Sequence, residues 1–395
     1  MPGSLTPRLH EALVRLCTTE RSFAKATTEL AFFTGASVHP DTARRRSEAA
    51  GALLLTEETA EARRILSELP ASPPGPETLV FSVDGAMLPL IGGVWKETRT
   101  LAVGAVQPPK ASDEGPIIQT SELSYFSRLT DSTTFADLAL LELHRRGIER
   151  AGRVGAVVDG AAWCQSFIDY HSAEAVRILD LPHAAEYLSA IGQTPTEEGP
   201  LLSAGALKQL RDDLKETGPH EVLAKLRVLV AAHPERAALN TSLAYLEQRV
   251  EQMDYPRFVA EGWPIGSGMV ESANKLVVEE RMKGAGKHWE ERNVNPMLTL
   301  CNALCNARWV ERWEVIEQAQ RRQLLVRRQE RHERRRVGDA VEVAEAVVAP
   351  ALPVAPAPVA EVVVPPTPVA PAPKPLHPWK RAWSIRRQCE LADAA

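Results

Sequence analysis

The stretch LVFSVDGAMLPL, residues 79–90, is rich in apolar and β-branched residues and carries one acid, Asp84, directly before a glycine. This composition predicts a β-strand. GGVWKETRTLAVGAV (92–106) follows after a glycine turn and predicts the partner strand of a hairpin. A third strand is expected from about Ile117 to Leu129.

Strands and helices alternate further along the chain. GRVGAVVDGAAW (152–163) predicts a short strand that ends in Asp159, and AVRILDLPHAAEYL (175–188) predicts a strand ending at Asp180 with a helix behind it. Three strands, a helix at 133–148 and then this alternation predict an α/β fold with a mixed sheet. From about residue 185 to 256 the pattern is helical, which predicts a helical insertion.

Composition shifts divide the rest of the chain into regions. Residues 1–70 predict a helical region, and the proline-rich segment 71–78 predicts a linker to a sheet-containing domain at 79–320. Residues 321–336 contain eight arginines and predict a basic helix. The Pro/Ala/Val-rich residues 337–395 predict a disordered tail.

The N-terminal region has a pattern typical of a helix-turn-helix. A helix from Ser22 to about Phe33, a turn at Gly35 and a helix after Pro40 would place a basic second helix in a DNA major groove. The basic residues expected to contact DNA are Arg44 and Arg45. A plain structural hairpin has the same pattern, so both interpretations stay open.

The composition limits the possible partners and compartments. The formal net charge is −5 over 395 residues, so a polyanion would be bound by local patches only. Five cysteines without a CxxC pair favour free thiols in a reducing, cytoplasmic compartment. No apolar run is long enough to cross a bilayer, and we expect no membrane partner.

Two acids share the same local context. Asp84 lies in SVDG and Asp159 in VVDG, each at the end of an apolar run. If the two strands are neighbours, the acids lie close together, and they repel unless a cation neutralises them. Glu271, in the glycine-flanked stretch GWPIGSGMVES (262–272), would complete a site for hard divalent cations. Either Asp-Gly pair by itself also fits an ordinary turn.

Basic residues follow Glu271 in the sequence. The candidates for contact with DNA phosphates are Lys275, Arg281, Lys283 and Lys287. Trp289 offers a surface for a flipped base, and the alternative is a solvated basic loop with Trp289 in the core. Asp180 and His183, beyond a strand end, are expected to support the site.

These blocks resemble a known family. DGAMLPLIGGVWKETRTLAVGAV (84–106), VVDGAAWCQSF (157–167) with ILDLPHAAEYL (178–188), and GWPIGSGMVESANKLVVEERMKGAGKHW (262–289) resemble successive blocks of bacterial insertion-sequence DDE transposases, the ISKra-type group in particular. The similarity extends over about residues 79–310. It implies an RNase H-like catalytic domain in which Asp84, Asp159 and Glu271 form a catalytic triad.

The resemblance also implies an activity and its partners. Two Mg²⁺ (or Mn²⁺) ions at the triad would promote cleavage of double-stranded DNA at the transposon end and strand transfer to target DNA. A homo-oligomer on paired DNA ends, in the cytoplasm and associated with the nucleoid, is expected. Two alternatives remain: a related metal-dependent nuclease without strand transfer, and a non-catalytic DNA-binding regulator.

Overall fold

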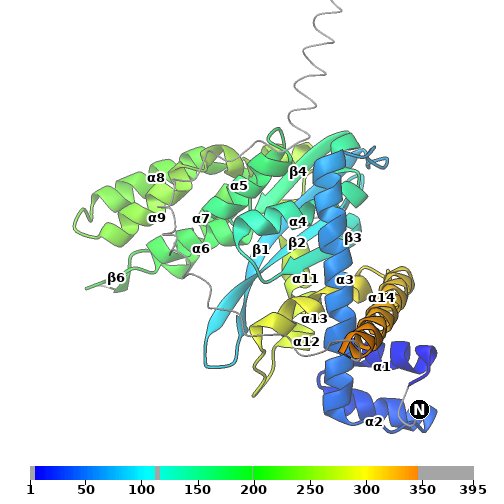
Figure 1. Ribbon diagram of the computed structural model, residues 1–395. Coiled ribbons are helices and arrows are strands. Elements are labelled where there is room, and N and C mark those ends of the chain that lie inside the picture. The colour runs from blue at the N-terminus through cyan, green and yellow to red at the C-terminus, as the bar shows by residue number, and fades with distance from the viewer. Residues whose placement is uncertain (1–4, 112–115, 198, 346–395) are drawn as a thin grey trace, which may run out of the picture.

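The fold centres on a five-stranded mixed sheet, seen in a computed structural model that describes residues 5–111, 116–197 and 199–345 (Figure 1). The strands are β1 Thr78–Pro89, β2 Trp95–Val106, β3 Thr120–Arg128, β4 Arg153–Val158 and β5 Val176–Leu179. Their order is β3-β2-β1-β4-β5, with β1–β2 and β2–β3 antiparallel and β1–β4 and β4–β5 parallel. The predicted α/β fold with a mixed sheet is therefore confirmed.

The central strand β1 is buried on both faces, which explains its continuous apolar run. Phe81 and Val83 pack into a core cluster with α4 (Ser132–Arg145) and α5 (Ala162–His171). Val80 and Leu88 point the other way, into a cluster that contains residues of α11 (Gly268–Ala273) and α13 (Glu291–Cys305). The sheet is thus the middle layer between two layers of helices.

The edge strand β3 is sealed by asparagine side chains from α13 and from its C-cap residue, Asn306. Each asparagine accepts a hydrogen bond from the backbone N–H of one β3-side residue through Oδ1 and donates to the same residue's carbonyl through Nδ2. The pairs are Asn295–Leu129 (2.7 and 3.0 Å), Asn302–Ser127 (3.1 and 3.3 Å) and Asn306–Tyr125 (2.8 and 2.8 Å). An edge strand otherwise presents unpaired backbone groups, so this helix face takes the place of a sixth strand.

The third strand is shorter than the sequence predicts. It begins at Thr120 and not at Ile117, because Ile117 instead forms an isolated bridge with Lys110.

Three helices precede the sheet. They are α1 Pro7–Thr19, α2 Phe23–Thr34 and α3 Pro40–Glu68. Ser22 caps α2 by accepting a hydrogen bond from Lys25 N (3.1 Å), and Gly35 ends it with φ 70°, a conformation that glycine adopts at low cost. The helix-turn-helix pattern predicts both features, yet α3 has 29 residues and runs along the body of the protein (Figure 1).

The helix α3 packs closely against α13. A Cβ added at Gly51 would lie 2.2 Å from the carbonyl oxygen of Pro296, so only glycine allows this approach.

Arg128 in β3 forms a buried ion pair with Glu58 of α3 (2.5 Å). Arg308 donates two hydrogen bonds to Glu142 of α4 (2.6 and 2.8 Å).

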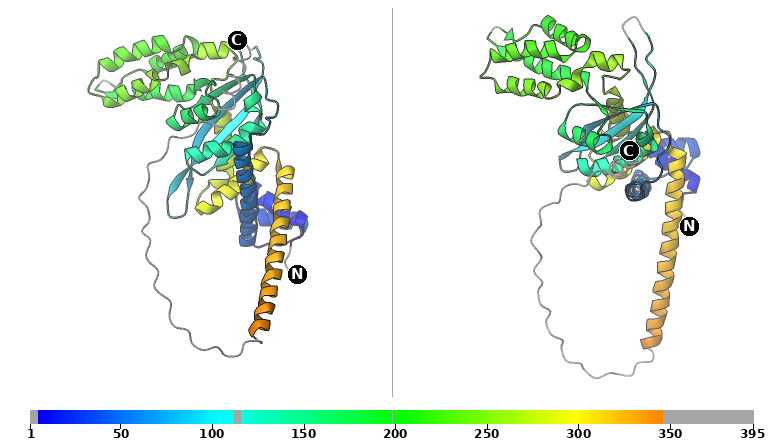
Figure 2. Two further views of the ribbon diagram at one scale, coloured as in Figure 1. Left: turned by 45° about the horizontal axis from the view of Figure 1, so that its top comes forward. Right: turned by 90° about the horizontal axis from the view of Figure 1, so that it is seen from above.

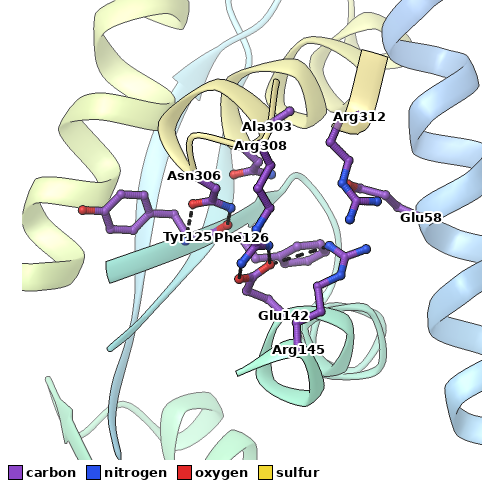
Figure 3. A pocket seen from close by; sticks show the side chains of 10 residues that line it. Glu58, Tyr125, Phe126, Glu142, Arg145, Ala303, Asn306, Arg308 and Arg312 are labelled. Carbon is purple, nitrogen blue, oxygen red and sulfur yellow. Dashed lines mark hydrogen bonds and ion pairs between the residues drawn. The ribbon is translucent and has the colours of Figure 1, made fainter. Parts of the chain in front are cut away.

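Glu58, Glu142 and Arg308 line a small cavity of about 10 Å³ where α3, β3, α4 and α13 meet (Figure 3). A buried charge is costly unless it is paired. The pairing therefore fixes the N-terminal helices to the sheet in one arrangement.

The predicted insertion leaves the sheet after β5 and extends to one side of it (Figure 1). Its helices are α6 Leu181–Gly192, α7 Ala204–Glu216, α8 Pro219–Ala231, α9 Ala237–Glu247 and α10 Tyr255–Ala260. The expectation of a wholly helical segment is wrong in one detail. A two-stranded ribbon, β6 (Pro195–Thr196) and β7 (Gly199–Pro200), lies between α6 and α7.

After α11 the chain forms a π-helical turn, Asn274–Glu279, and α12, Glu280–Met282. The last described helix, α14, runs from Trp309 to Glu345 and extends away from the rest of the protein (Figure 2). It includes the predicted basic helix and continues past 337, where the sequence places the start of a tail. Residues 346–395 lie outside the described part of the chain. Among the described helices, none is both long and apolar enough to span a membrane.

The asparagine seal predicts a specific loss of stability. Asn302→Ala leaves the buried N–H of Ser127 without its partner and removes one of the two donors to its carbonyl oxygen, the other being Arg128, and we expect the free energy of unfolding to fall by about 2 kcal/mol. Denaturant unfolding measures the change. Asn240→Ala, at an exposed position of α9, is the matched control and should have almost no effect. Equal stability of both variants would contradict the proposed role of the seal.

Candidate active site

Parallel pairing of β1 and β4 brings the first two acids to one edge of the sheet. The last paired residues are Phe81 and Ala156. Asp84 and Asp159 each lie three residues beyond this pair, so the same register places them side by side. At this point β4 ends and β1 continues as a ribbon with β2.

The carboxylate of Asp84 is half-buried and held by two donors. Gly85 N donates to its Oδ1 (2.7 Å), and Asn274 Nδ2 donates to its Oδ2 (2.8 Å). Burial raises the pKa of Asp84, and the nearby carboxylates of Asp159, Glu271 and Glu97 raise it further. The third acid predicted from sequence therefore lies within electrostatic reach of the first.

Asp159 is held by the first turn of α5. Its Oδ1 accepts hydrogen bonds from Ala161 N (2.9 Å) and from the thiol of Cys164 (3.2 Å). Burial raises the pKa of the Cys164 thiol, and the carboxylate of Asp159 raises it further, so the thiol stays protonated and donates. Cys164 is thus a site residue, although the sequence predicts it only as one of several free thiols.

The insertion packs against the turn that follows Asp159. Tyr245 of α9 donates a hydrogen bond to the carbonyl oxygen of Asp159, and Arg249 Nη2 donates to the carbonyl oxygen of Gly160 (2.8 Å). Tyr245 also stacks on Tyr187 with 3.8 Å between the ring centroids. The insertion therefore restrains the backbone of the second acid.

Glu271 is exposed on α11, a helix that contacts β1 and β2. Asp180 holds the turn before this helix. Its carboxylate accepts hydrogen bonds from Ser267 N (2.6 Å) and from His183 N (3.0 Å), and thus caps α6 at the same time. Asp180 thereby positions the helix that carries Glu271.

His183 lies at the rim of the site region. It is half-buried, its Nδ1 is 3.3 Å from Glu186, and its ring meets that of Tyr187 edge-on. It is in contact with the insertion's aromatic side chains, consistent with structural support.

Glu97 is an acid that the sequence analysis missed. It lies on β2 opposite Met87, and its Oε1 is 2.3 Å from where a Cβ on Gly85 would be. The Glu97 side chain thus occupies the space beside Gly85. Arg99 pairs with Glu97 (2.6 Å) and partly neutralises it. The hairpin register pairs Glu97 with Met87, three residues along β1 from Asp84.

The donor set suits a hard divalent cation, although it is not fully assembled. Carboxylate oxygens are the ligands that Mg²⁺ and Mn²⁺ prefer, and the Oδ1 atom of Asn274 beside Asp84 is buried without a hydrogen-bond partner. Within the described residues, no three His, Cys, Asp or Glu side chains already converge as a metal-binding group. Asp84 and Asp159 are instead engaged by the donors named above.

Two of the predicted DNA contacts are wrong. Arg281 is 4% exposed, and its Nε donates to the carbonyl oxygen of Cys17 (2.7 Å). Burial lowers its pKa. Trp289 is 7% exposed and donates through Nε1 to the carbonyl oxygen of Met282 (2.8 Å). Both side chains are core residues, since the N-terminal helices cover them, and neither surface is open to a phosphate or a base.

The other basic candidates differ in exposure. Lys275 is exposed on the same helix face as Glu271. Lys283 pairs with Glu279 (2.7 Å), and Lys287 donates to the carbonyl oxygen of Arg281 (3.0 Å). Burial, with Arg281 nearby, lowers the pKa of Lys287. Lys275 is therefore the candidate best placed to contact DNA.

The two N-terminal arginines are engaged by acids of their own helix. Arg44 pairs with Asp41 (2.6 Å) and Glu48 (2.9 Å), and Arg45 pairs with Asp41 (2.8 Å). Arg45 is the more exposed of the two, with 66% of its side chain accessible. A DNA contact by either side chain stays a prediction.

Comparisons with known proteins give little direct guidance. No protein-family model matches the chain, and no curated protein matches it. Among solved structures, the Drosophila P element transposase strand transfer complex is similar with a TM-score of 0.28 and 10% identity, over 79% of this chain and 81% of that chain. A superposition this loose carries no weight for activity, so function is inferred from the site residues themselves.

Because the pKa of Asp84 is raised, replacing Asp84 by a neutral residue should increase the stability of the protein in a pH-dependent way. The folded state binds the Asp84 proton more tightly than the unfolded state, so ionisation at neutral pH costs stability. Asp84→Asn should therefore raise the free energy of unfolding at about pH 7, and the gain should vanish below about pH 3, where both states are protonated.

Denaturant unfolding across this pH range, without divalent ions, measures the effect. Asp213→Asn is the matched control of opposite sign, because a hydrogen bond from Lys225 lowers the pKa of Asp213. A loss of stability in Asp84→Asn at neutral pH would contradict the prediction.

Proposed function

We propose that the protein is a metal-dependent DDE transposase with an RNase H-like catalytic domain, which cleaves DNA at insertion-sequence ends and joins them to target DNA. The observation that carries the proposal is the β1–β4 register, which places Asp84 beside Asp159, together with the contact of β1 with α11, the helix that bears Glu271. The charged groups that shift the pKa of Asp84 are all acids. Such a cluster is unfavourable by itself and favours a bound cation.

The proposed site chemistry follows from these carboxylates. Asp84, Asp159 and Glu271 would hold Mg²⁺ or Mn²⁺, in two ions, which lower the pKa of a water molecule and stabilise charge on the attacked phosphate. The carboxylates bind and orient, and none of them is a nucleophile. Asp180, Cys164 and the donors on Asp84 keep the acids in place.

The proposed reaction has two balanced steps. In the first, a water oxygen bonds to phosphorus and the 3′ oxygen leaves with a proton, which frees a 3′-hydroxyl at the transposon end. In the second, that 3′ oxygen attacks a target phosphodiester, and the target's own 3′ oxygen leaves with the proton. One phosphodiester replaces another, so the second step needs no ATP.

The proposed substrate is double-stranded DNA, and the proposed assembly is a homo-oligomer on paired ends. The exposed Lys275 lies one helical turn from Glu271, where a phosphate attacked at the site would pass. The sequence blocks favour the ISKra-type group of bacterial insertion sequences, with action on the nucleoid.

Replacement of each acid tests the proposal directly. Asp84→Ala, Asp159→Ala and Glu271→Ala should each lower DNA cleavage at least about 100-fold, because each removes a cation ligand, while DNA binding remains. Cleavage of end-labelled transposon-end DNA and a mobility-shift assay measure the two properties. Glu216→Ala, at an exposed acid of α7, is the control and should cleave normally. Normal cleavage by any of the three variants would refute the triad.

A strand-transfer assay separates the transposase from a nuclease. A pre-cleaved transposon end, labelled at the 5′ end of the strand whose free 3′-hydroxyl attacks, should become joined to a longer target molecule. Cleavage without any joined product would instead support the RNase H-like nuclease.

Lys275 should contribute to affinity through the DNA backbone. Lys275→Ala should weaken binding to all DNA sequences alike and reduce the slope of log K against log salt by about one. Fluorescence anisotropy at several salt concentrations measures this. Lys208→Ala, on the exposed face of α7, is the matched control. An unchanged salt slope in Lys275→Ala would contradict a phosphate contact.

A further inference from the structure

Asn274 has a buried side-chain amide in which only one of the two polar atoms is hydrogen-bonded. It begins the π-helical turn after α11 and is 7% exposed. Its Nδ2 donates to Asp84 Oδ2 (2.8 Å), whereas its Oδ1 is buried and has no hydrogen-bond partner. An unsatisfied buried acceptor typically costs about 1–3 kcal/mol, so its retention needs an explanation.

The asparagines of α13 show what a purely structural asparagine does in this protein. Asn295, Asn302 and Asn306 each use Oδ1 as an acceptor and Nδ2 as a donor toward the same backbone segment. Both ends of each amide are satisfied. Asn274 departs from this pattern, and its single partner is an acid of the candidate active site.

The local helix geometry places the Asn274 side chain next to Asp84. Glu271 and Asn274 are three residues apart and lie on the same side of the helix. The following turn is π-helical, with Glu280 N–H bonded to Lys275 O, and such turns occur often at functional sites. The wider turn keeps Asn274 and the following Val277 buried against the sheet while Lys275 stays exposed.

We propose that Asn274 is a positioning residue of the divalent-cation site, with Nδ2 fixing the Asp84 carboxylate and Oδ1 accepting a hydrogen bond from a water bound to the cation. This inference rests on the proposed metal-dependent function. Hard cations such as Mg²⁺ keep several waters, and hydrogen bonds to the ligands and waters tune cation affinity. The bound water would satisfy the buried amide oxygen.

Cation binding to the full chain in the absence of DNA tests the inference. Mn²⁺ is titrated into the wild type, Asn274→Leu, Asp84→Asn and Ser272→Ala, and free Mn²⁺ is followed by electron paramagnetic resonance. Asn274→Leu should weaken Mn²⁺ binding about tenfold or more, as should Asp84→Asn. Ser272→Ala, an exposed neighbour on α11, should bind as the wild type does.

Two further readouts separate positioning from folding. The melting temperature without divalent ions reports the effect on folding, because Asn274→Leu removes the donor to Asp84 together with the unsatisfied oxygen. In DNA cleavage, the Mn²⁺ concentration needed for half-maximal rate should rise more than the maximal rate falls. A merely structural asparagine would lower the melting temperature and leave the Mn²⁺ requirement unchanged.

The outcomes distinguish this inference from the function on which it rests. Wild-type Mn²⁺ affinity in Asn274→Leu, together with weakened binding in Asp84→Asn, overturns the role of Asn274 and leaves the transposase proposal standing. Wild-type protein without saturable Mn²⁺ binding overturns both.

A second variant decides the question if Asn274→Leu does not fold. Asn274→Asp keeps an oxygen but places a carboxylate against Asp84. It should melt lower than the wild type without ions and gain more on Mn²⁺ addition, because the cation neutralises the pair. An Mn²⁺-induced gain no larger than that of the wild type overturns the inference.

Discussion

The parallel pairing of β1 with β4 is the constraint on which the candidate site depends. It sets Asp84 and Asp159 at equal distance beyond the last paired residues, Phe81 and Ala156. Because β1 is buried on both faces, the strand has no freedom to shift its register without exposing its core side chains. The sheet thus imposes the repulsion between the acids, and this repulsion lowers the stability of the fold.

The third acid is positioned by a different set of contacts. Asp180 holds the turn before α11, and Asn274 connects the end of α11 to Asp84. Further along the same segment, Arg281 donates to the carbonyl oxygen of Cys17 in α1 and lies over the ring of Phe23, 4.5 Å from its centroid. The N-terminal helices are therefore packed against the segment that carries Glu271.

The insertion contributes to the site although it carries none of the three acids. Tyr245 and Arg249 donate to the backbone carbonyls of Asp159 and Gly160. A Cβ at Gly160 would lie 2.5 Å from the Tyr245 hydroxyl oxygen. The glycine after Asp159 therefore leaves room for Tyr245 and also adopts the positive φ of the turn. The asparagine seal covers the edge strand β3, whereas Asp84 and Asp159 lie at the ends of the two neighbouring strands β1 and β4 inside the sheet.

The sequence by itself determined the mixed α/β class, the main strands and the two Asp-Gly strand ends, because hydrophobic periodicity and turn residues are local properties. It also identified Asp84, Asp159 and Glu271 as candidates, and their proximity in space agrees with that choice without testing their catalytic role. Only the tertiary structure decided which polar side chains are accessible. In the sequence, Arg281 and Trp289 indicate a basic and aromatic surface. In the structure, helices more than 200 residues earlier in the chain bury both side chains. Glu97, Cys164 and Asn274 join the site through hairpin register, strand pairing and a π-helical turn, because contacts between distant segments depend on how the whole chain packs.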